Sequence, residues 1–419
     1  MQIHKFGGAS TNSVERIRNV HSIVSSLPLG KKLIVVSALG KTTNALEKVV
    51  QFSVNGEKEK AMEELNRIRT QHLNMGSELF GSHKERLEGL NAFFDEATEN
   101  LKGLSNKNYN KSYDSMVHFG ELFSSFMVSS FLNINGVRNV WLDVRKVLKT
   151  NDHFREAGIL WDVCKPLIRD EIDNLFKDES VIITQGFIGK TLKGDDTTLG
   201  REGSDFTAAI FANILHAESV TIWKDVNGVM NADPKQVKDT VPVSHLNYKE
   251  VIEMAYYGAQ VIHPKTIKPL QNESIPLFVR CFLQPDLQGT VINGIAPDQL
   301  PPMIVFKKKQ VLFSFQTSDF SFIEGKPSRE IKNIFAAALV KGNLTQNTAI
   351  SMLICIDENE DKQNRILSES KNFIVSVETG LTLLTIRHYT GEVIDAFTKG
   401  KQIILEQRTK DTLQVLFRE

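Results

Sequence analysis

The sequence predicts an α/β protein: a three-layer αβα sandwich around a mostly parallel sheet, followed by a smaller α+β region. From the first residues, short apolar runs of strand length alternate with longer segments of helical periodicity. Repeated β-α-β units of this kind form parallel sheets covered by helices on both faces. A proline-rich stretch at 293–302 (NGIAPDQLPP) then precedes shorter elements, as in a linker. The chain has 419 residues, more than one hydrophobic core normally holds.

The first region opens with a strand at 2–6, a Gly-Gly turn, and a helix at 13–27 with one mainly apolar face. A charged insert at about 45–104 is expected to form a solvated helical hairpin or lid. The remaining elements of the region are strands at 32–37, 137–143, 181–188 and 219–223, and helices at 113–132 and 204–216. Ligands of such sheets bind beyond the carboxyl ends of the strands, and the polar motifs of this chain fall there.

The second region is expected to contain small α+β modules that repeat weakly. Its strands are expected at 310–316, 348–356, 373–377, 381–388, 402–407 and 412–417, and its helices at 328–341, 358–370 and 392–399. This order describes one βαββαβ module followed by an abbreviated βαββ module. The expected domains are therefore residues 1–295 and residues 303–419.

Composition favours a small-molecule partner. Lys+Arg and Asp+Glu each number 50, so no net charge attracts nucleic acid or an anionic membrane. The three cysteines lie far apart and form no CxxC pair, which argues against disulfide scaffolding and zinc thiolate sites. No apolar run reaches the roughly 18 residues of a membrane span, and the opening MQIHKFGGAS lacks the apolar core of a signal peptide. We expect a cytoplasmic protein.

The first two motifs each follow a strand and precede a helix. In KFGGAS, Gly7 and Gly8 let backbone N–H groups approach a phosphate, and Lys5 adds positive charge. A Gly-Gly turn is also an ordinary connection between a strand and a helix. In SALGKTTN, the hydroxyls of Ser37 and Thr43 suit a substrate carboxylate, although helix capping would use the same residue types.

Three further motifs carry charge. Glu121 lies inside a largely apolar helix and needs a partner, which could be a substrate ammonium or an internal Arg or Lys. In TLGREGSD, Arg201 can grip a carboxylate in a bidentate pair. Asp205 could position the donor, but Ser204 or Asp205 could also be a plain N-cap. WKDVNG and the DPK segment after it could hold ribose and phosphates, yet each alone would pass for a loop.

The order of these motifs is more specific than any one of them. The chain carries KFGGAS, VVSALGKTTN, GELFSS, LDVRKVLKTND, GREGSD, WKDVNGVMNADPK and GAQVIHP. In this order they resemble the aspartate kinases of the amino-acid kinase superfamily. The resemblance covers about residues 2–295 well. It continues through LTLLTIRHY and KQIILEQRTKDTLQVLF, which are similar to the end of that family's ACT-type regulatory region.

The resemblance implies transfer of the γ-phosphoryl group of ATP to the β-carboxylate of L-aspartate, the first step of lysine, threonine and methionine biosynthesis. Mg²⁺ would be carried on the ATP phosphates, with few protein ligands. The catalytic residues would be Lys5 and Asp205. Aspartate would be bound by Ser37, Thr43, Glu121, Arg201 and Ser204. ATP would be bound by Gly7, Gly8, Ser10, Lys224, Asp225, Met230, Asp233 and Lys235.

Four residues depart from the family pattern. Glu202 replaces a glycine and adds negative charge near the phosphates, and Gln260 replaces a lysine that would contact ATP. Met230 stands where tyrosine is frequent, and Lys235 where arginine is common. These departures support the alternative of a catalytically weak, metabolite-binding regulatory paralogue. Another amino-acid kinase, such as a glutamate kinase, is a further alternative, against which DVR…TND and the ACT-like tail argue.

The ACT-like tail also implies assembly and regulation. Such modules have exposed sheet edges that pair across subunits, so we expect a homodimer formed through residues after about 303. Lysine and threonine are the leading effectors. We expect weak or absent inhibition, because the segment 319–328 fits the family's effector loop poorly and the second module lacks its final helix and strand. No homoserine dehydrogenase-like segment follows Glu419, so a monofunctional enzyme is expected.

Overall fold

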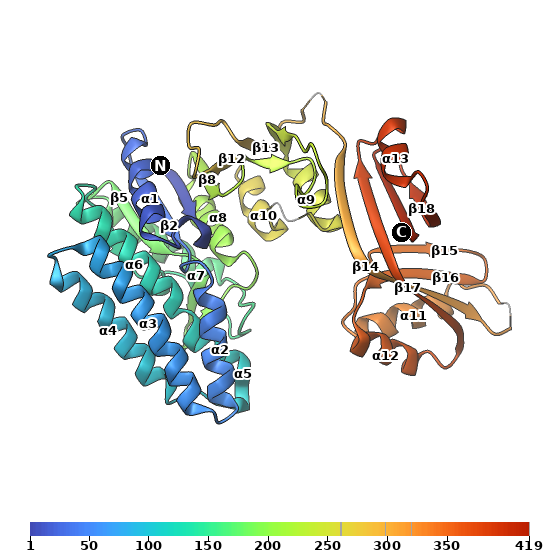
Figure 1. Ribbon diagram of the computed structural model, residues 1–419, viewed down its shortest axis with the longest axis horizontal. Coiled ribbons are helices and arrows are strands. Elements are labelled where there is room, and N and C mark those ends of the chain that lie inside the picture. Colours follow the sequence, from blue (N-terminus) through green and yellow to red (C-terminus); the bar gives the residue numbers. More distant parts are fainter. Residues whose placement is uncertain (260–261, 298, 320, 419) are drawn as a thin grey trace. The chain divides into compact units, whose positions relative to one another are not determined.

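The computed structural model describes residues 1–259, 262–297, 299–319 and 321–418, and the chain divides into two compact units (Figure 1). Unit 1 comprises Met1–Val229, Pro242–Ile252 and Val261–Pro297. Unit 2 comprises Met230–Val241, Glu253–Gln260 and Asp298–Glu419. Each unit has its own sheet and its own hydrophobic core.

The core of unit 1 is an eight-stranded sheet with the order β11-β13-β12-β8-β1-β2-β5-β3. Its strands are β1 (Gln2–Phe6), β2 (Lys32–Val36), β3 (Val140–Leu142), β5 (Val181–Gln185), β8 (Ser219–Lys224), β11 (His245–Asn247), β12 (Leu277–Cys281) and β13 (Thr290–Asn293). The β12–β13 pair is antiparallel and the other neighbouring strands are parallel. Every residue of β2 and β5 is buried, as expected for a parallel sheet covered on both faces.

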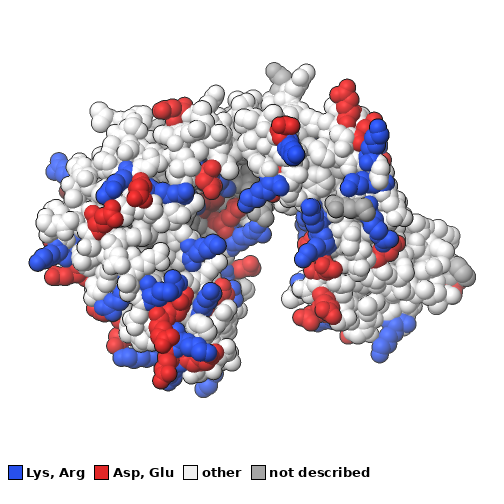
Figure 2. Space-filling view, in the orientation of Figure 1, with Lys and Arg blue, Asp and Glu red and all other residues white. Residues whose placement is uncertain are grey.

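Helices form the two outer layers of unit 1 (Figure 1). One group contains α1 (Val14–Ser26), α3 (Lys58–Phe80) and α6 (Phe119–Ile134), which pack on one another. The other contains α8 (Gly203–Leu215), against which both α7 (Trp161–Leu175) and α10 (Pro264–Asn272) pack. The insert predicted at 45–104 consists of the rest of α2 (Thr42–Val54), α3 and α4 (Lys84–Leu101). Lys and Arg mix with Asp and Glu over this helical part in Figure 2.

Two predicted elements of unit 1 are broken in the structure. The helix predicted at 113–132 is two helices, α5 (Tyr109–Val117) and α6, which meet at His118. The strand predicted at 181–188 ends at Gln185, because the chain turns sharply at Gly186. A side chain at Gly186 would lie 2.4 Å from Cβ of Ser204. The chain then enters a small separate sheet of β4 (Lys149–Thr150), β6 (Ile188–Thr191) and β7 (Asp196–Thr198).

Unit 2 is built on a six-stranded sheet with the order β15-β16-β14-β17-β19-β18, in which every neighbouring pair is antiparallel. Its strands are β14 (Met303–Thr317), β15 (Leu344–Asn347), β16 (Ser351–Asp357), β17 (Phe373–Arg387), β18 (Gln402–Arg408) and β19 (Thr412–Arg418). Its helices are α11 (Lys326–Ala337), α12 (Glu360–Glu369) and α13 (Gly391–Thr398). Further short elements are β9 (Val229–Met230), β10 (Pro242–Val243), α9 (Tyr248–Tyr257) and the 3₁₀ helices Gly8–Ser10, Asn106–Asn108 and Val144–Lys146.

The two longest strands of unit 2 differ most from prediction. The strands predicted at 373–377 and 381–388 are one strand, β17, and the strand predicted at 310–316 is the second half of β14. Gly380 adopts φ 72, but the turn-like sequence VETG does not end β17, because pairing with β14 continues on both sides of it. The pairing of β14 with β17 shifts between Lys307 and Gln310 and again between Gln310 and Leu312. Such bulges bend a sheet.

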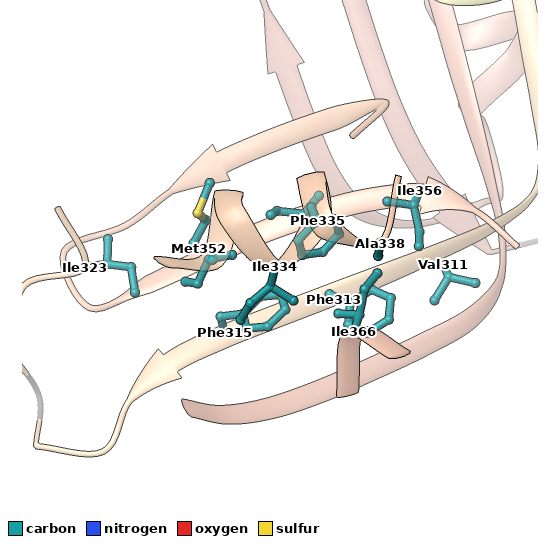
Figure 3. Packing of buried hydrophobic residues seen from close by; sticks show 12 residues of the cluster. Val311, Phe313, Phe315, Ile323, Ile334, Phe335, Ala338, Met352, Ile356 and Ile366 are labelled. Carbon is teal, nitrogen blue, oxygen red and sulfur yellow. The ribbon is translucent and has the colours of Figure 1, made fainter. Parts of the chain in front are cut away.

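The bent sheet buries apolar side chains on both faces. On one face Phe313, Phe315 and Phe335 pack with the aliphatic side chains of β16, α11 and α12 (Figure 3). The cluster on the other face takes residues from all six strands: Leu312, Leu344, Cys355, Leu381, Leu383, Leu405 and Leu416. Because this cluster includes both edge strands, β15 and β18, the sheet curls around it.

A closed polar group lies beside this second apolar cluster. It consists of Lys307, Gln310, Asn343 and Asp357, here called the Gln310 cluster. The Lys307 Nζ donates to Asn343 Oδ1 at 2.7 Å, and Asn343 Nδ2 donates to Gln310 Oε1 at 2.8 Å. The Asp357 carboxylate accepts from both Gln310 and Asn343 at 2.9 Å. The four side chains therefore satisfy one another across the bulged part of the sheet.

In the part of the chain that the structure describes, no helix is both long enough and apolar enough to cross a membrane.

Candidate active site

A cavity of about 590 Å³ opens in unit 1 beyond the carboxyl ends of β1, β2 and β8. This is where ligands bind in parallel α/β sheets. The walls come from the KFGGAS and SALGKTT turns, from α5 and α6, from the segments at 155–156 and 200–205, and from the end of β8. The lining residues used below are Lys5, Gly7, Gly8, Ser10, Ser37, Ala38, Thr43, Tyr113, Glu121, Arg155, Glu156, Phe187, Arg201, Glu202, Ser204, Asp205, Lys224 and Asp225.

Lys5 and Asp205 form an ion pair at the centre of this lining. Lys5 is in β1, Asp205 is in the first turn of α8, and the Lys5 Nζ lies 2.7 Å from Asp205 Oδ1. Both side chains are largely buried, with exposed fractions of 12% and 4%. A buried pair of this kind holds the ammonium group in a fixed place. The cavity therefore contains a preorganised positive charge.

The glycine turn after β1 is packed against the turn after β2. A side chain at Gly8 would lie 2.7 Å from the carbonyl oxygen of Ala38, and the Gly40 N–H donates to the Gly8 carbonyl at 3.0 Å. Glycine is therefore required at position 8 by close backbone approach. Ser10 also lines the cavity, but its hydroxyl is buried and donates to the Trp223 carbonyl at 3.5 Å. Its side chain thus joins this turn to the end of β8.

Glu121 is a buried carboxyl group in which one oxygen lacks a hydrogen-bond partner among the described residues. It lies in the first turn of α6 with 3% of its surface exposed. Burial raises its pKa to about 8, although the Ala38 N–H and the charge of Lys5 oppose the shift. Within the described residues its Oε2 has no hydrogen-bond partner. No Arg or Lys forms an ion pair with it in this part of the chain, so the internal partner considered from the sequence is not found.

The turn before α8 has two residues in the left-handed region. Gly200 has φ 73 and Glu202 has φ 52. Glu202 is the N-cap residue of α8, so the alternative that Ser204 or Asp205 is the N-cap is wrong. The Glu202 carboxylate accepts the His263 N–H at 2.7 Å. This arrangement leaves the first turn of α8 at the cavity, where helix N–H groups favour an anion.

The structure brings most of the predicted site residues together. Ser37, Thr43, Arg201, Ser204, Lys224 and Asp225 all line the cavity with the residues described above. Met230, Asp233 and Lys235 belong to unit 2, and their role in ATP binding stays a prediction. Asp233 forms a local turn, since its carboxylate accepts the Lys235 N–H at 2.9 Å. Gln260 lies outside the described residues.

The sequence interpretation missed several residues of the wall, among them Tyr113, Arg155, Glu156 and Phe187. It also missed Asp114, which accepts hydrogen bonds from the Arg155 N–H at 2.9 Å and from the Thr198 hydroxyl at 2.6 Å. Burial raises the pKa of Asp114 to about 6. The available signal was its spacing, because Asp114 and Glu121 are seven residues apart, two turns of the helix predicted there, in a largely apolar segment.

The carboxylates of the described residues do not form a metal cage. No group of three or more His, Cys, Asp or Glu side chains among them could hold a metal ion. Asp205 and Asp225 do line the cavity. This arrangement suits an ion such as Mg²⁺, which binds one or two carboxylates and takes its other ligands from phosphates and water.

Comparisons with known proteins place this geometry in a family context. The model of the Amino acid kinase family matches residues 1–281. Aspartokinase 1, chloroplastic, of Arabidopsis thaliana is 35% identical over 299 residues, covering 70% of this chain and 52% of that protein. Lysine-sensitive aspartokinase 3 of Escherichia coli strain K12 is 29% identical over 399 residues, covering 92% and 86%. The chain spans about half the length of the Arabidopsis aspartokinases it matches.

Solved structures give the same result for the fold. E. coli aspartokinase III in complex with aspartate and ADP has a TM-score of 0.82 and 27% identity, covering 100% of this chain and 96% of that one. The aspartate kinase of Clostridium acetobutylicum has a TM-score of 0.80 at 20% identity, covering 100% and 96%. These likenesses confirm the predicted fold class, a mostly parallel α/β unit followed by an antiparallel unit of ACT-like type.

Proposed function

The chain belongs to the amino acid kinase family, and from this membership we propose that it is an aspartate kinase. The reaction is transfer of the ATP γ-phosphoryl group to the β-carboxylate of L-aspartate, giving 4-phospho-L-aspartate and ADP. Support comes from the names of its relatives, one of which was solved with aspartate and ADP. The observation that carries the proposal is the Glu121 carboxyl group, buried with one unpartnered oxygen in a cavity that also contains Lys5 and Arg201.

The acceptor amino acid is held by opposite charges. Glu121 binds its ammonium group, which completes the hydrogen bonding of Oε2 and compensates the cost of a buried carboxylate. Arg201 grips the α-carboxylate, and the hydroxyls of Ser37, Thr43 and Ser204 contribute further hydrogen bonds. The β-carboxylate is already ionised at pH 7, so it attacks without a general base.

The phosphoryl group is stabilised by fixed charge and by backbone N–H groups. Lys5, oriented by Asp205, neutralises charge that develops on the transferring group. The turn containing Gly7 and Gly8 and the first turn of α8 supply N–H donors to the ATP phosphates. Lys224 and Asp225 contribute from the end of β8. Mg²⁺ would neutralise phosphate charge when bound with ATP, and Asp205 and Asp225 are the carboxylates that would hold it.

A hydroxamate assay with ATP, Mg²⁺ and a panel of acidic amino acids tests this proposal. Aspartate should give an acyl hydroxamate, whereas glutamate should react poorly, because it is one methylene longer than a pocket of fixed length accommodates. Equal activity with glutamate would contradict the aspartate assignment. Absence of turnover with every acceptor, together with binding of aspartate, would favour the catalytically weak regulatory paralogue.

We also propose that two chains associate through unit 2 and that the protein works in the cytoplasm. Unit 2 has two sheet edges, β15 and β18, whose free backbone groups can pair with a second copy. The three cysteines are free and buried, as is usual in a reducing compartment. Light scattering after size exclusion should give a dimer. Titration with lysine and threonine should leave activity little changed, while strong inhibition would overturn that expectation.

A further inference from the structure

Arg155 is a second guanidinium group on the wall of the cavity, besides Arg201. It lies in the loop between β4 and α7, and 38% of its side chain is exposed. This exposure is enough for a ligand in the cavity to reach it. None of the sequence motifs drew attention to it, and the proposed function assigns it no role.

The backbone at Arg155 is held in an unusual conformation. Its φ of 72 lies in the left-handed region, which a residue with a long side chain adopts only at a cost. The buried Asp114 carboxylate accepts the Arg155 N–H at 2.9 Å and also accepts the Thr198 N–H. This anchor keeps the residue in place, and a constrained residue on the wall of a binding cavity is a candidate for function.

The side chain is ordered before any ligand arrives. Its guanidinium carbon lies 4.1 Å from the centre of the Tyr113 ring, a cation–π contact. Its Nη2 donates to Glu47 Oε1 at 3.0 Å. Glu47 lies on α2 one turn after Thr43, which lines the cavity. The pair with Glu47 uses one of the five N–H donors of the guanidinium group.

We propose that Arg155 binds the α-carboxylate of the acceptor together with Arg201, and that Glu47 holds the guanidinium until the acceptor binds. The inference rests on the proposed function. The β-carboxylate must lie toward Lys5 to react, so the α-carboxylate is the group left to be gripped elsewhere. Arg201 is exposed and loses side-chain entropy when it binds. Arg155 is already stacked on Tyr113, so it adds charge-assisted hydrogen bonds at a smaller entropic cost.

Aspartate binding should be measured by calorimetry, which needs no turnover, on the full chain with the substitutions Arg155→Gln, Arg155→Gly and Glu47→Gln. Both Arg155 variants should bind aspartate about 10- to 100-fold more weakly, the usual effect of losing hydrogen bonds to a charged group. Arg155→Gly tolerates φ 72, so it tests the side chain without backbone strain. Glu47→Gln should bind aspartate equally well or more tightly, because the competing carboxylate is gone.

β-Alanine, which lacks the α-carboxylate, identifies the contacted group. Its affinity should be the same in the parent protein and in both Arg155 variants, so that the preference for aspartate over β-alanine falls by the same 10- to 100-fold. If Glu47→Gln weakened aspartate binding as much as Arg155→Gln, the pair would be merely structural and the proposal would be wrong. Unchanged aspartate binding in Arg155→Gln would also refute it. Absence of aspartate binding in the parent protein would overturn both this proposal and the substrate assignment.

Discussion

The two units each contain a cluster of hydrogen-bonded polar side chains, and the clusters differ in whether they are complete. In unit 2, the Gln310 cluster closes on itself: Lys307, Gln310, Asn343 and Asp357 supply donors and acceptors to one another. In unit 1, Lys5 and Asp205 form an ion pair, but Glu121 beside them keeps an unpartnered oxygen. A buried polar group normally finds a partner. The complete cluster therefore supports the fold, and the incomplete one is prepared for a ligand.

The largest expected effect comes from the incomplete cluster, with Lys5→Met. It should lower kcat by about 10²–10³-fold or more and raise the KM for aspartate much less, because the lysine charge acts mainly on the developing transition state. Steady-state kinetics with varied aspartate and ATP separate the two effects. Near-normal turnover would remove Lys5 from the phosphoryl site and would weaken the contrast between the clusters.

The next largest effect is expected from Glu121→Gln, which should change both the KM for aspartate and the pH dependence of that KM. With a pKa raised to about 8, Glu121 is mostly protonated at pH 7 in the free protein and must lose its proton to bind an ammonium group. The KM for aspartate should therefore fall as pH rises from 6 to 8 and then level. In Glu121→Gln the KM should be about 10- to 100-fold higher and should lack this dependence. An unchanged profile in the variant would assign the titration to another group.

Glu121 should also make the free energy of unfolding fall as pH rises, whereas a carboxylate in a salt bridge makes it rise. The unfolded chain loses the proton near the ordinary pKa of 4.5, whereas the folded chain keeps it up to about 8. Folding stability therefore falls as pH rises between these values. Glu121→Gln should remove this loss. The melting temperature of the variant should therefore rise relative to that of the parent protein as pH increases from 5 to 8.

Asn343→Ala tests the complete cluster. Removing Asn343 leaves Lys307, Gln310 and Asp357 each without one partner, so the free energy of unfolding should fall by about 1–3 kcal/mol. Scanning calorimetry of the full chain measures this loss. Asn372→Ala, at an exposed hydrogen bond in the same unit, is the control and should change stability by less than about 0.5 kcal/mol. Equal effects would show that the Gln310 cluster contributes little.

Glu202→Gly should have the smallest effect. Glycine suits φ 52 better than glutamate, but the substitution also removes the hydrogen bond to the His263 N–H. Each change amounts to about 1 kcal/mol and they oppose each other, so net stability should stay within about 1 kcal/mol. The KM for ATP should fall a few-fold if the negative charge faces the phosphates. Ser274→Gly, another residue with positive φ, controls for the backbone effect.

The sequence predicted the elements of the first unit better than those of the second unit. Strand ends and glycine turns are local signals, so β1, β2, β8 and the motifs that follow them were placed within one or two residues. The predictions failed where tertiary contact decides the structure. Gly186 breaks a strand because Ser204 leaves no space for a side chain, and Gly380 fails to break β17 because pairing with β14 continues on both sides. Arg155 escaped notice because its position depends on Asp114, 41 residues away.

The two long strands of unit 2 limit how this protein can be rebuilt. β14 and β17 each extend over 15 residues and carry both halves of the six-stranded sheet. No loop therefore separates one half from the other, and an exchange of a single half with that of a relative must cut both strands in mid-pairing. A chimera joined between β13 and β14 preserves all of this pairing, although it parts the sheet from Ala232 and Val237, which pack against it. Genetic exchange should therefore tolerate replacement of the whole sheet better than replacement of either half.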